Sequence, residues 1–425
     1  MKRIKVITLG CSKNSVDTEH LLAALPPAEF ELAEGWPVDY LLYNTCGFIG
    51  DAKEESIAAV FEGVEAKKRG DAARLGVFGC LSQRYASSLP ELIPEVDAWF
   101  GARDMNPVLA WLGAPPSRFV SRRREGGGYA YLKISEGCDR RCSYCAIPGI
   151  RGAHRSVPVD DLVKEAASLA SEGVSELILI AQDTTWYGLD LYGKRSLGRL
   201  LGELSAIPQI RRLRIHYSYP ASFPDDVLEQ MRDNPKVCKY LDIPLQHISD
   251  PVLRNMHRGI DSRGTRELIA RLRATVPGVV LRTTMIVGHP GEGEAEFREL
   301  MDFVEEARFE RLGAFKYSEE EGTWGAEHLA DDVPEEVKQE RLDALMSLQA
   351  GISAGFNKSR VGKVENVIID AVSPSGLVCR SAFESPEVDG EILVKPKRAG
   401  AARIGSYIDV RIDGFDEYDL SAVEL

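Results

Sequence analysis

Residues 129–145 read YAYLKISEGCDRRCSYC and place three cysteines directly after a short apolar strand pattern. Cys138, Cys142 and Cys145 follow a C-x3-C-x2-C spacing, which lets one compact loop direct three thiolates at a common point. A structural zinc site needs a fourth ligand, for which His154 is the nearest candidate. A [4Fe–4S] cluster held by three cysteines instead leaves one iron free to bind another ligand. The spacing therefore favours such a cluster, with a zinc knuckle completed by His154 as the alternative.

The cysteine loop opens a long series of alternating strand and helix patterns. The expected strands lie near residues 129–134, 176–181, 210–216, 239–243, 279–286 and 311–315. Helical patterns separate most of them, for example at 159–172 and 294–308. Six strand–helix units in succession predict a partial (β/α)6 barrel, whose active site lies at the carboxyl ends of its strands. We assign residues 129–333 to this domain.

A second group of cysteines lies upstream, one after each of three expected strands. The strands cover residues 4–9, 38–45 and 75–79, with helical patterns at 15–25 and 51–69. Cys11, Cys46 and Cys80 follow these strands, and parallel strands end at one edge of their sheet. This arrangement favours a second metal site over three separately buried cysteines. We expect residues 1–115 to form an open parallel α/β domain.

The remaining segments are read from their composition and patterning. Prolines, arginines and glycines indicate a linker at 116–128, and a charged connecting helix is expected at 334–358. Short strands with turns predict a small all-β domain at 359–425. Cys238 and Cys379 have no partner at a useful spacing, so we expect both to be packing residues.

The composition is that of a globular chain with an acidic balance. Of its 425 residues 44% are hydrophobic, and the formal net charge is −13. No apolar run approaches the ~18 residues of a membrane span, and the apolar stretch near the start is too short for a signal peptide. We therefore expect a cytoplasmic protein without a membrane partner. The negative charge argues against broad nucleic-acid binding and leaves nucleic acid at most a secondary partner.

The expected terminal domain is itself acidic. From Arg360 to Leu425 there are eight Lys or Arg and twelve Asp or Glu, a net charge of −4. RNA binding requires cations that neutralise phosphates, so this domain suits a basic protein better than RNA. Solubility alone is the other explanation of its charge. A basic run at 117–141 could contact RNA, a substrate protein or only solvent.

The cysteine loop, with an aromatic residue before its last cysteine, resembles that of the radical S-adenosylmethionine (SAM) superfamily. Residues 10–14, 44–49 and 78–80 narrow the resemblance to the methylthiotransferases, and it covers essentially the whole chain. That family combines an N-terminal cluster domain, a radical SAM barrel and a small terminal β-barrel called TRAM. The resemblance implies an auxiliary and a radical SAM [4Fe–4S] cluster, held respectively by Cys11, Cys46 and Cys80 and by Cys138, Cys142 and Cys145.

Two further stretches resemble the branch of the family that modifies a ribosomal protein. They are residues 44–49 with 54–57, and residues 242–247, where the transfer-RNA branch has other patterns. The implied substrate is an aspartate of the twelfth small-subunit ribosomal protein. By the resemblance, SAM cleavage gives a radical that removes hydrogen from the aspartate β-carbon, the auxiliary cluster carries the sulfur added there, and a second SAM supplies the methyl group. An electron donor is also implied, and the sequence does not identify it.

Candidate contacts with SAM lie at predicted strand ends or beside the cluster, and they are Tyr144, Gln182, Asp183, Gln246 and Arg282. Gln182 and Asp183 follow an apolar strand, where the superfamily binds the SAM amino group. Arg282 interrupts an apolar strand and needs an anion, either the SAM carboxylate or a carboxylate of the protein. Tyr144 could contact adenine or be a core aromatic. No conventional general base is identified.

The turn at 288–292 is expected to approach the adenosine through its backbone. His289 stands in it where the family more usually has phenylalanine, and we expect its imidazole to face solvent. Two other functions remain open. One is a transfer-RNA adenosine methylthiotransferase with the same chemistry, and the other is a non-catalytic RNA-binding scaffold stabilised by zinc.

Overall fold

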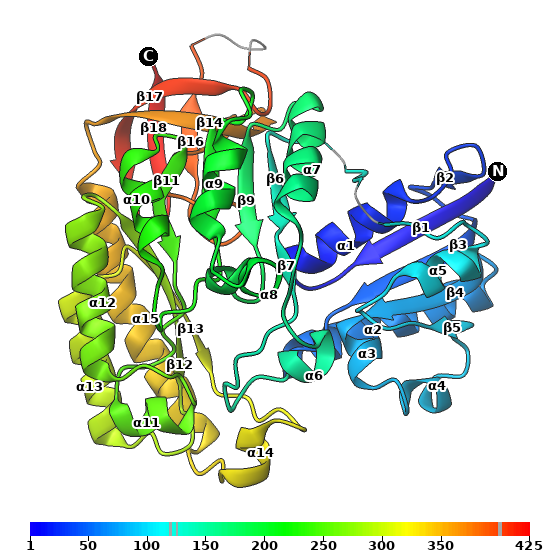
Figure 1. Ribbon diagram of the computed structural model, residues 1–425, viewed down its shortest axis with the longest axis horizontal. Coiled ribbons are helices and arrows are strands. Elements are labelled where there is room, and N and C mark those ends of the chain that lie inside the picture. Colours follow the sequence, from blue (N-terminus) through cyan, green and yellow to red (C-terminus); the bar gives the residue numbers. More distant parts are fainter. Residues whose placement is uncertain (119–120, 125, 398–401) are drawn as a thin grey trace.

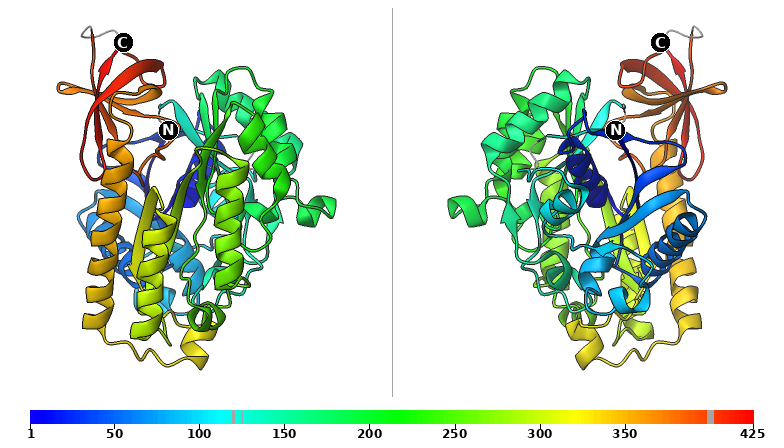
Figure 2. Two further views of the ribbon diagram at one scale, coloured as in Figure 1. Left: turned by 90° about the vertical axis from the view of Figure 1, so that its left-hand side faces the viewer. Right: turned by 90° about the vertical axis from the view of Figure 1, so that its right-hand side faces the viewer.

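The computed structural model describes residues 1–118, 121–124, 126–397 and 402–425. The expected linker at 116–128 includes residues 119, 120 and 125, which lie outside the described part. Three blocks follow one another along the chain (Figure 1). The N-terminal block lies beside the central one, and the terminal β-barrel lies at one end of the long helix α15 (Glu335–Lys358) (Figures 1 and 2). Among the described residues, no helix has the length and apolar character needed to cross a membrane.

The N-terminal block is a parallel sheet with the strand order β2-β1-β3-β4-β5. Its strands are β1 (Lys2–Thr8), β2 (Phe30–Leu32), β3 (Val38–Thr45), β4 (Ala72–Gly79) and β5 (Ala98–Trp99). Its helices are α1 (Ser12–Ala23), α2 (Gly50–Lys68), α3 (Cys80–Arg84), α4 (Leu89–Leu92) and α5 (Asn106–Leu112). Thr8 pairs with Asn44 and Thr45 with Gly79, so β1, β3 and β4 end at one edge. The short strands β2 and β5 were not predicted.

The central block contains six parallel strands in the order β13-β12-β11-β10-β9-β6, which confirms the predicted partial barrel. The strands are β6 (Tyr129–Lys133), β9 (Glu176–Ile180), β10 (Arg212–Ile215), β11 (Val237–Asp242), β12 (Val280–Val287) and β13 (Arg311–Lys316). The main helices are α7 (Val159–Ser171), α9 (Leu197–Ser205), α10 (Asp225–Asp233), α12 (Ser262–Thr275) and α13 (Glu294–Ala307). Shorter ones are η1 (Thr184–Trp186), α8 (Leu189–Tyr192), α11 (Asp250–Asn255) and α14 (Trp324–His328).

The two faces of this sheet have different partners because strand side chains alternate. Leu177 and Leu179 of β9 belong to the large apolar core that the sheet shares with its covering helices. Ile178 and Ile180 instead pack with Val16 of α1, so the N-terminal block supplies a helix to the concave face.

The terminal block is a closed barrel in the order β14-β15-β16-β18-β17. Its strands are β14 (Val364–Ser373), β15 (Gly376–Arg380), β16 (Ile392–Lys395), β17 (Tyr407–Phe415) and β18 (Leu420–Glu424). The last strand was not predicted. Cys379 is buried in this barrel's core and Cys238 beside Tyr240 and Val280, in agreement with packing roles.

Residues 381–391, which we call the terminal-domain loop, enter the concave side of the central sheet from the amino ends of its strands and reach as far as His216, which directly follows β10. Ser385 Oγ lies 2.8 Å from His216 Nε2. Glu387 accepts hydrogen bonds from the hydroxyls of Tyr129 and Tyr131 at 3.1 and 3.0 Å. Figure 2 shows the terminal barrel seated at this end of the central block. The loop thus satisfies polar groups that the open sheet would otherwise bury without partners.

Candidate active site

The first cysteine trio lies where β1, β3 and β4 end. Cys11 precedes α1, Cys46 follows β3, and Cys80 begins α3. A Cβ atom added to Gly10, whose φ is +90°, would lie 2.7 Å from Cβ and 3.1 Å from Sγ of Cys46. Gly79, at φ +108°, is equally enclosed, because an added Cβ would lie 2.6 Å from the carbonyl oxygen of Thr45. These two close approaches require glycine and bring the three cysteine segments together.

The thiols of this trio have unequal environments. Desolvation raises the pKa of Cys80 to about 11 although Arg151 opposes it, and the charges of Cys11 and Cys46 add to the rise. Desolvation also acts on Cys11, but Lys13 and the first amides of α1 outweigh it and lower its pKa below the ordinary value of 9.0. The mutual influence of the three thiols reflects their proximity, and Cys11 is the one that remains exposed.

The second trio lies in a loop between β7 (Ser135–Glu136) and α6 (Ile147–Arg151), with β7 paired to β8 (Arg155–Ser156). The main chain of this loop is clamped. The Ser143 amide donates to the Met256 carbonyl at 3.1 Å, and the Ser143 carbonyl accepts from the Gly325 amide at 2.7 Å. The Cys138 amide donates to the Gly152 carbonyl at 3.0 Å. The C-x3-C-x2-C segment is thereby fixed to three separate parts of the barrel.

Desolvation raises the pKa of Cys138 to about 11 and that of Cys145 to about 12, and the charge of Cys142 contributes to both shifts. Arg258 Nη1 lies 3.4 Å from Cys142 Sγ and 3.3 Å from the Tyr144 hydroxyl. A positive group therefore faces the sulfur of a candidate ligand.

The donor sets fit a four-iron cube better than a single ion. Among the described residues, no three His, Cys, Asp or Glu side chains are arranged around one metal position. His154 Nε2 lies 3.1 Å from the hydroxyl of Ser156 rather than among the cysteines. A cube places its irons at separate corners, so its thiolates need not meet at one point. The zinc knuckle completed by His154 is not what the structure forms.

Two of the five expected SAM contacts present free polar atoms. The side-chain oxygens of Gln182 and Gln246 are buried and have no hydrogen-bond partner among the described residues. Gln246 adopts φ 78°, a conformation that is unfavourable for a residue with a side chain. Its amide donates to the Thr284 carbonyl and its carbonyl accepts from the Ile286 amide, both at 2.8 Å. The main chain is therefore held while the amide oxygen stays available for a ligand.

The two charged candidates are already paired within the protein. Asp183 accepts hydrogen bonds from the Thr185 amide at 2.8 Å and from Arg140 Nε at 2.8 Å. Arg282 Nη1 donates to Asp242 at 2.9 Å, and its Nε lies 3.6 Å from Asp389. Of the two anions considered for Arg282, the structure supplies the protein carboxylate.

Tyr144 and His289 lie near each other beside the cluster loop, with ring centroids 6.3 Å apart. The expectation that His289 faces solvent is wrong, because its exposed fraction is 0%. The ring of Tyr317 lies 4.8 Å away, and Lys338 of α15 packs over Gly288. Burial lowers the pKa of His289 to about 4, so the imidazole is neutral near neutral pH.

The sequence reading missed the arginines around the two trios. Arg140 lies between the rings of Trp186 and Tyr219, with its guanidinium carbon 4.1 and 3.9 Å from their centroids. Arg151 ends α6, is 4% exposed, and donates to Cys80. An arginine directly after the apolar stretch Ile147–Ile150 was the available sequence signal for the second of these.

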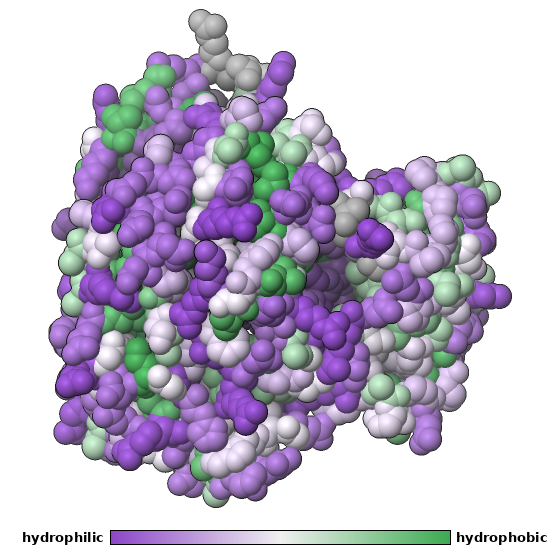
Figure 3. Space-filling model, viewed as in Figure 1, coloured by the Kyte–Doolittle hydropathy of each residue, from purple (hydrophilic) through white to green (hydrophobic). Residues whose placement is uncertain are grey.

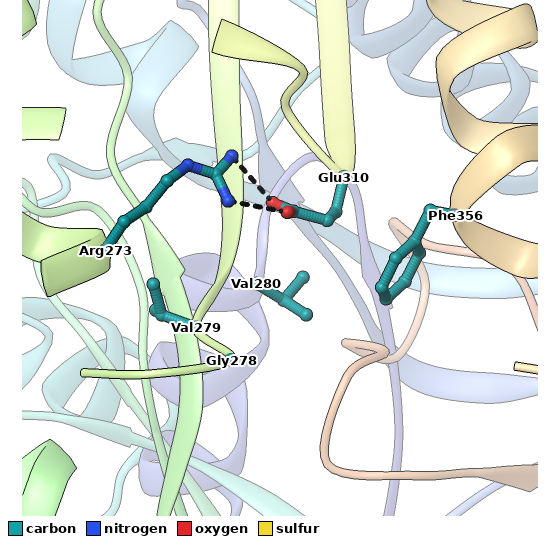
Figure 4. A pocket seen from close by; sticks show the side chains of 6 residues that line it. All are labelled: Arg273, Gly278, Val279, Val280, Glu310 and Phe356. Atoms are coloured by element: carbon teal, nitrogen blue, oxygen red, sulfur yellow. Dashed lines mark hydrogen bonds and ion pairs between the residues drawn. The ribbon is translucent and has the colours of Figure 1, made fainter. Parts of the chain in front are cut away.

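Two pockets lie away from both trios. A cavity of about 170 Å³ lies at the amino ends of β12 and β13, where Arg273 and Glu310 form an ion pair at 2.8 Å (Figure 4). A larger one of about 410 Å³ lies against the terminal-domain loop and includes Tyr129 and Asp389. The space-filling view is hollowed where the N-terminal block meets the central one, and hydrophilic residues border the hollow (Figure 3).

Family models match all three blocks of the chain. The radical SAM superfamily matches residues 132–304, the uncharacterized protein family UPF0004 matches 3–101, and the TRAM domain matches 361–424. The chain is 49% identical to the ribosomal protein uS12 methylthiotransferase RimO of Porphyromonas gingivalis, over 99% of this chain and 98% of that protein. It is 47% identical to the protein of the same name from Bacteroides thetaiotaomicron, with the same coverage of both.

Solved structures show the same fold at much lower identity. The radical SAM methyltransferase TsrM from Kitasatospora setae, with tryptophan and a SAM analogue bound, gives a TM-score of 0.56 at 16% identity. That match covers 74% of this chain and 73% of the other. A second structure of TsrM, with cobalamin and a [4Fe–4S] cluster, gives 0.55 at 16% identity over 95% and 84%.

Proposed function

The chain belongs to the family of RimO ribosomal protein uS12 methylthiotransferases, and from this we propose that it adds a methylthio group to the β-carbon of an aspartate in uS12, the twelfth small-subunit ribosomal protein. It is a transferase of the radical SAM type. The observation that carries the proposal is 49% identity along 99% of the chain, which spans all three blocks. The cysteine trio at the carboxyl ends of β1, β3 and β4 and the trio in the loop after β7 supply the donors that such chemistry needs.

Two [4Fe–4S] clusters and SAM are the proposed cofactors. Cys138, Cys142 and Cys145 would hold the radical SAM cluster, and Cys11, Cys46 and Cys80 the auxiliary one. When bound, these groups supply the radical that activates the aspartate carbon and the sulfur and methyl that are added to it. Because each trio has three cysteines, each four-iron cluster would have one iron without a protein ligand.

The side chains of this protein hold and orient those groups. We assign SAM binding to the unpartnered amide oxygens of Gln182 and Gln246, which can accept hydrogen bonds from an amino group. Tyr144 offers an aromatic face beside the cluster loop, and its hydroxyl is fixed by Arg258. Asp183 and Arg282 affect SAM binding only indirectly, because their charges already pair with Arg140 and Asp242. They fix the strand ends rather than contact SAM.

The substrate assignment has support beyond the family. Ribosomal proteins bind RNA and are basic, and the terminal barrel carries a net charge of −4. Transfer RNA is the less supported substrate, because an acidic domain repels phosphates. We also propose that the enzyme works in the cytoplasm and receives electrons from a separate reduced donor.

The test is an assay of reconstituted enzyme under anaerobic conditions, with dithionite as reductant and with SAM. uS12 and transfer RNA are offered in separate reactions, and mass spectrometry reads the gain of one methylthio group. We expect the gain on a uS12 aspartate alone. Modification of transfer RNA instead would replace the substrate assignment, and absence of SAM cleavage would favour the non-catalytic scaffold.

Matched cysteine variants locate the chemistry. Cys46→Ala should abolish methylthio transfer, whereas Cys238→Ala, which alters a buried packing cysteine, should retain it. Equal losses in both variants would show that the effect comes from the fold and not from cluster ligation.

A further inference from the structure

Arg151 connects the two cysteine sites. It ends α6, directly after the second trio, yet its side chain reaches into the N-terminal block. Its Nε lies 3.1 Å from Cys80 Sγ, and its Nη2 donates to Asn14 Oδ1 at 2.6 Å. Its Nη1 donates to Asp17 at 2.8 Å and to Glu136 at 3.1 Å. One guanidinium therefore contacts a candidate ligand of the auxiliary cluster, helix α1 and the strand that precedes the radical SAM cluster.

The contacts continue from Glu136 toward the proposed SAM site. The other carboxylate oxygen of Glu136 accepts from Gln182 Nε2 at 2.7 Å. Lys133 pairs with Glu136 at 2.8 Å and also with Asp17. The result is an unbroken series of hydrogen bonds from the Cys80 sulfur to Gln182.

The charges in this series are balanced. Arg151 and Lys133 are positive, and Asp17 and Glu136 are negative. The side chain of Arg151 is 2% exposed, so water screens its charge weakly. Because its Nε is directed at sulfur rather than at a carboxylate, part of this charge acts on the cysteine site.

We infer that Arg151 is a positioning residue with two effects. It fixes the position of Cys80, a proposed ligand of the auxiliary cluster, relative to the barrel, and it raises the reduction potential of that cluster. The inference rests on the proposed auxiliary cluster. Reduction adds negative charge to a cluster, and a hydrogen bond or a cation at a ligand sulfur stabilises the reduced form. Arg151 supplies both to Cys80, so its removal shifts the potential to more negative values.

If Arg151 only held the two blocks together, another arginine at the same interface should have the same effect on the cluster. Arg103 provides this comparison. Arg103 belongs to the N-terminal block and donates from Nε to the Ile150 carbonyl of α6 at 2.9 Å. It therefore joins the same two blocks at the same helix. Within the described part of the chain its side chain donates to the main-chain carbonyls of Gly149 and Ile150, and it is exposed. Arg103→Gln weakens the interface without altering the surroundings of Cys80.

The experiment uses the full chain with Cys138, Cys142 and Cys145 changed to Ala, so that only the auxiliary cluster is assembled. Iron and sulfide are measured first, and the potential is then determined by anaerobic titration with dithionite and mediators, followed by electron paramagnetic resonance. Arg151→Gln, Arg151→Lys and Arg103→Gln are compared in this background. We expect a negative shift in Arg151→Gln, a smaller one in Arg151→Lys, which keeps the charge, and none in Arg103→Gln.

Each outcome has a distinct meaning. Absence of iron in the parent background contradicts the auxiliary cluster itself and hence the proposed function. An intact cluster with an unchanged potential in Arg151→Gln contradicts the role of Arg151 alone. Loss of the cluster in Arg151→Gln, with retention in Arg151→Lys and Arg103→Gln, supports the inference. Loss in both glutamine variants would show a general failure of the interface and overturn it.

Discussion

The hydroxyl of Tyr240, in the middle of the barrel sheet, donates a hydrogen bond of 2.6 Å to Asp389 of the terminal-domain loop. Both side chains are buried, and Asp389 also lies 3.6 Å from Arg282. Arg282 is in turn bound to Asp242 at the carboxyl end of β11. The terminal β-barrel is therefore part of the interior of the central domain, and its removal would affect residues near the proposed SAM site.

Replacing Asp389 with alanine should lower the free energy of unfolding by about 3 kcal/mol. The change leaves the Tyr240 hydroxyl and part of the Arg282 charge buried without a partner. Denaturant unfolding followed by fluorescence gives the value. Glu417→Ala alters an exposed carboxylate of the same domain and should stay within about 0.5 kcal/mol of the parent. Equal stability of the two variants would contradict the buried role of the loop.

The apoprotein should lose stability as the pH falls below about 6.5. Burial lowers the pKa of His216 to about 3, so the unfolded chain binds a proton there first. The pKa values of Glu176 and Glu384 are about 2, because Arg380 and Arg360 respectively outweigh the effect of burial. Their contribution is complete above the ordinary value of 4.5 and is lost as the pH falls from there toward 2.

Unfolding free energies measured at a series of pH values should therefore decline in two stages. His216→Asn should make the first stage smaller, because His289, whose pKa burial also lowers to about 4, still contributes from the ordinary histidine value of 6.5 downward. The second stage should be unchanged. A flat profile between neutral pH and about pH 4 would show that these buried groups titrate alike in the folded and unfolded states.

Iron analysis should separate the two trios. The reconstituted parent should hold about eight irons, and a variant with Cys11, Cys46 and Cys80 changed to Ala about four. Cys379→Ala, in the core of the terminal barrel, should retain about eight. Identical iron contents in the parent and the triple variant would contradict the proposed auxiliary cluster.

Gly10→Ala should prevent assembly of the auxiliary cluster although it replaces none of the candidate ligands. The new Cβ would lie 2.7 Å from Cβ of Cys46, at a φ of +90° that disfavours alanine. We expect loss of about four irons and retention of SAM cleavage by the barrel cluster. Gly35→Ala, in the same block with open space around it, is the control and should keep the parent's iron content.

Local patterns predicted the strands of the barrel and the ends at which the cysteines lie. Apolar runs such as Leu177–Ile180 identify buried strands, and parallel order then places the residues that follow them at one edge. The same reasoning identified Gln182 and Gln246 as candidate SAM contacts, because a polar residue that follows a buried strand is seldom a packing residue.

Contacts between distant parts of the chain could not be predicted in this way. His289 is buried by α15, whose Lys338 is far along the sequence from the turn at 288–292. Arg282 required an anion, and either of two choices satisfied its charge until the fold placed Asp242 beside it. The pairing of Ser385 with His216 spans 169 positions and leaves no periodic signal in either segment.

The terminal-domain loop has a consequence for how the chain is made. A ribosome releases the barrel strands well before residues 381–391, so Arg214 and His216 emerge when Ala382 and Ser385, their eventual hydrogen-bond partners, have not yet been synthesised. The central domain can reach its final packing only after translation is nearly complete. A product truncated before the loop therefore keeps Arg214 and His216 without these partners.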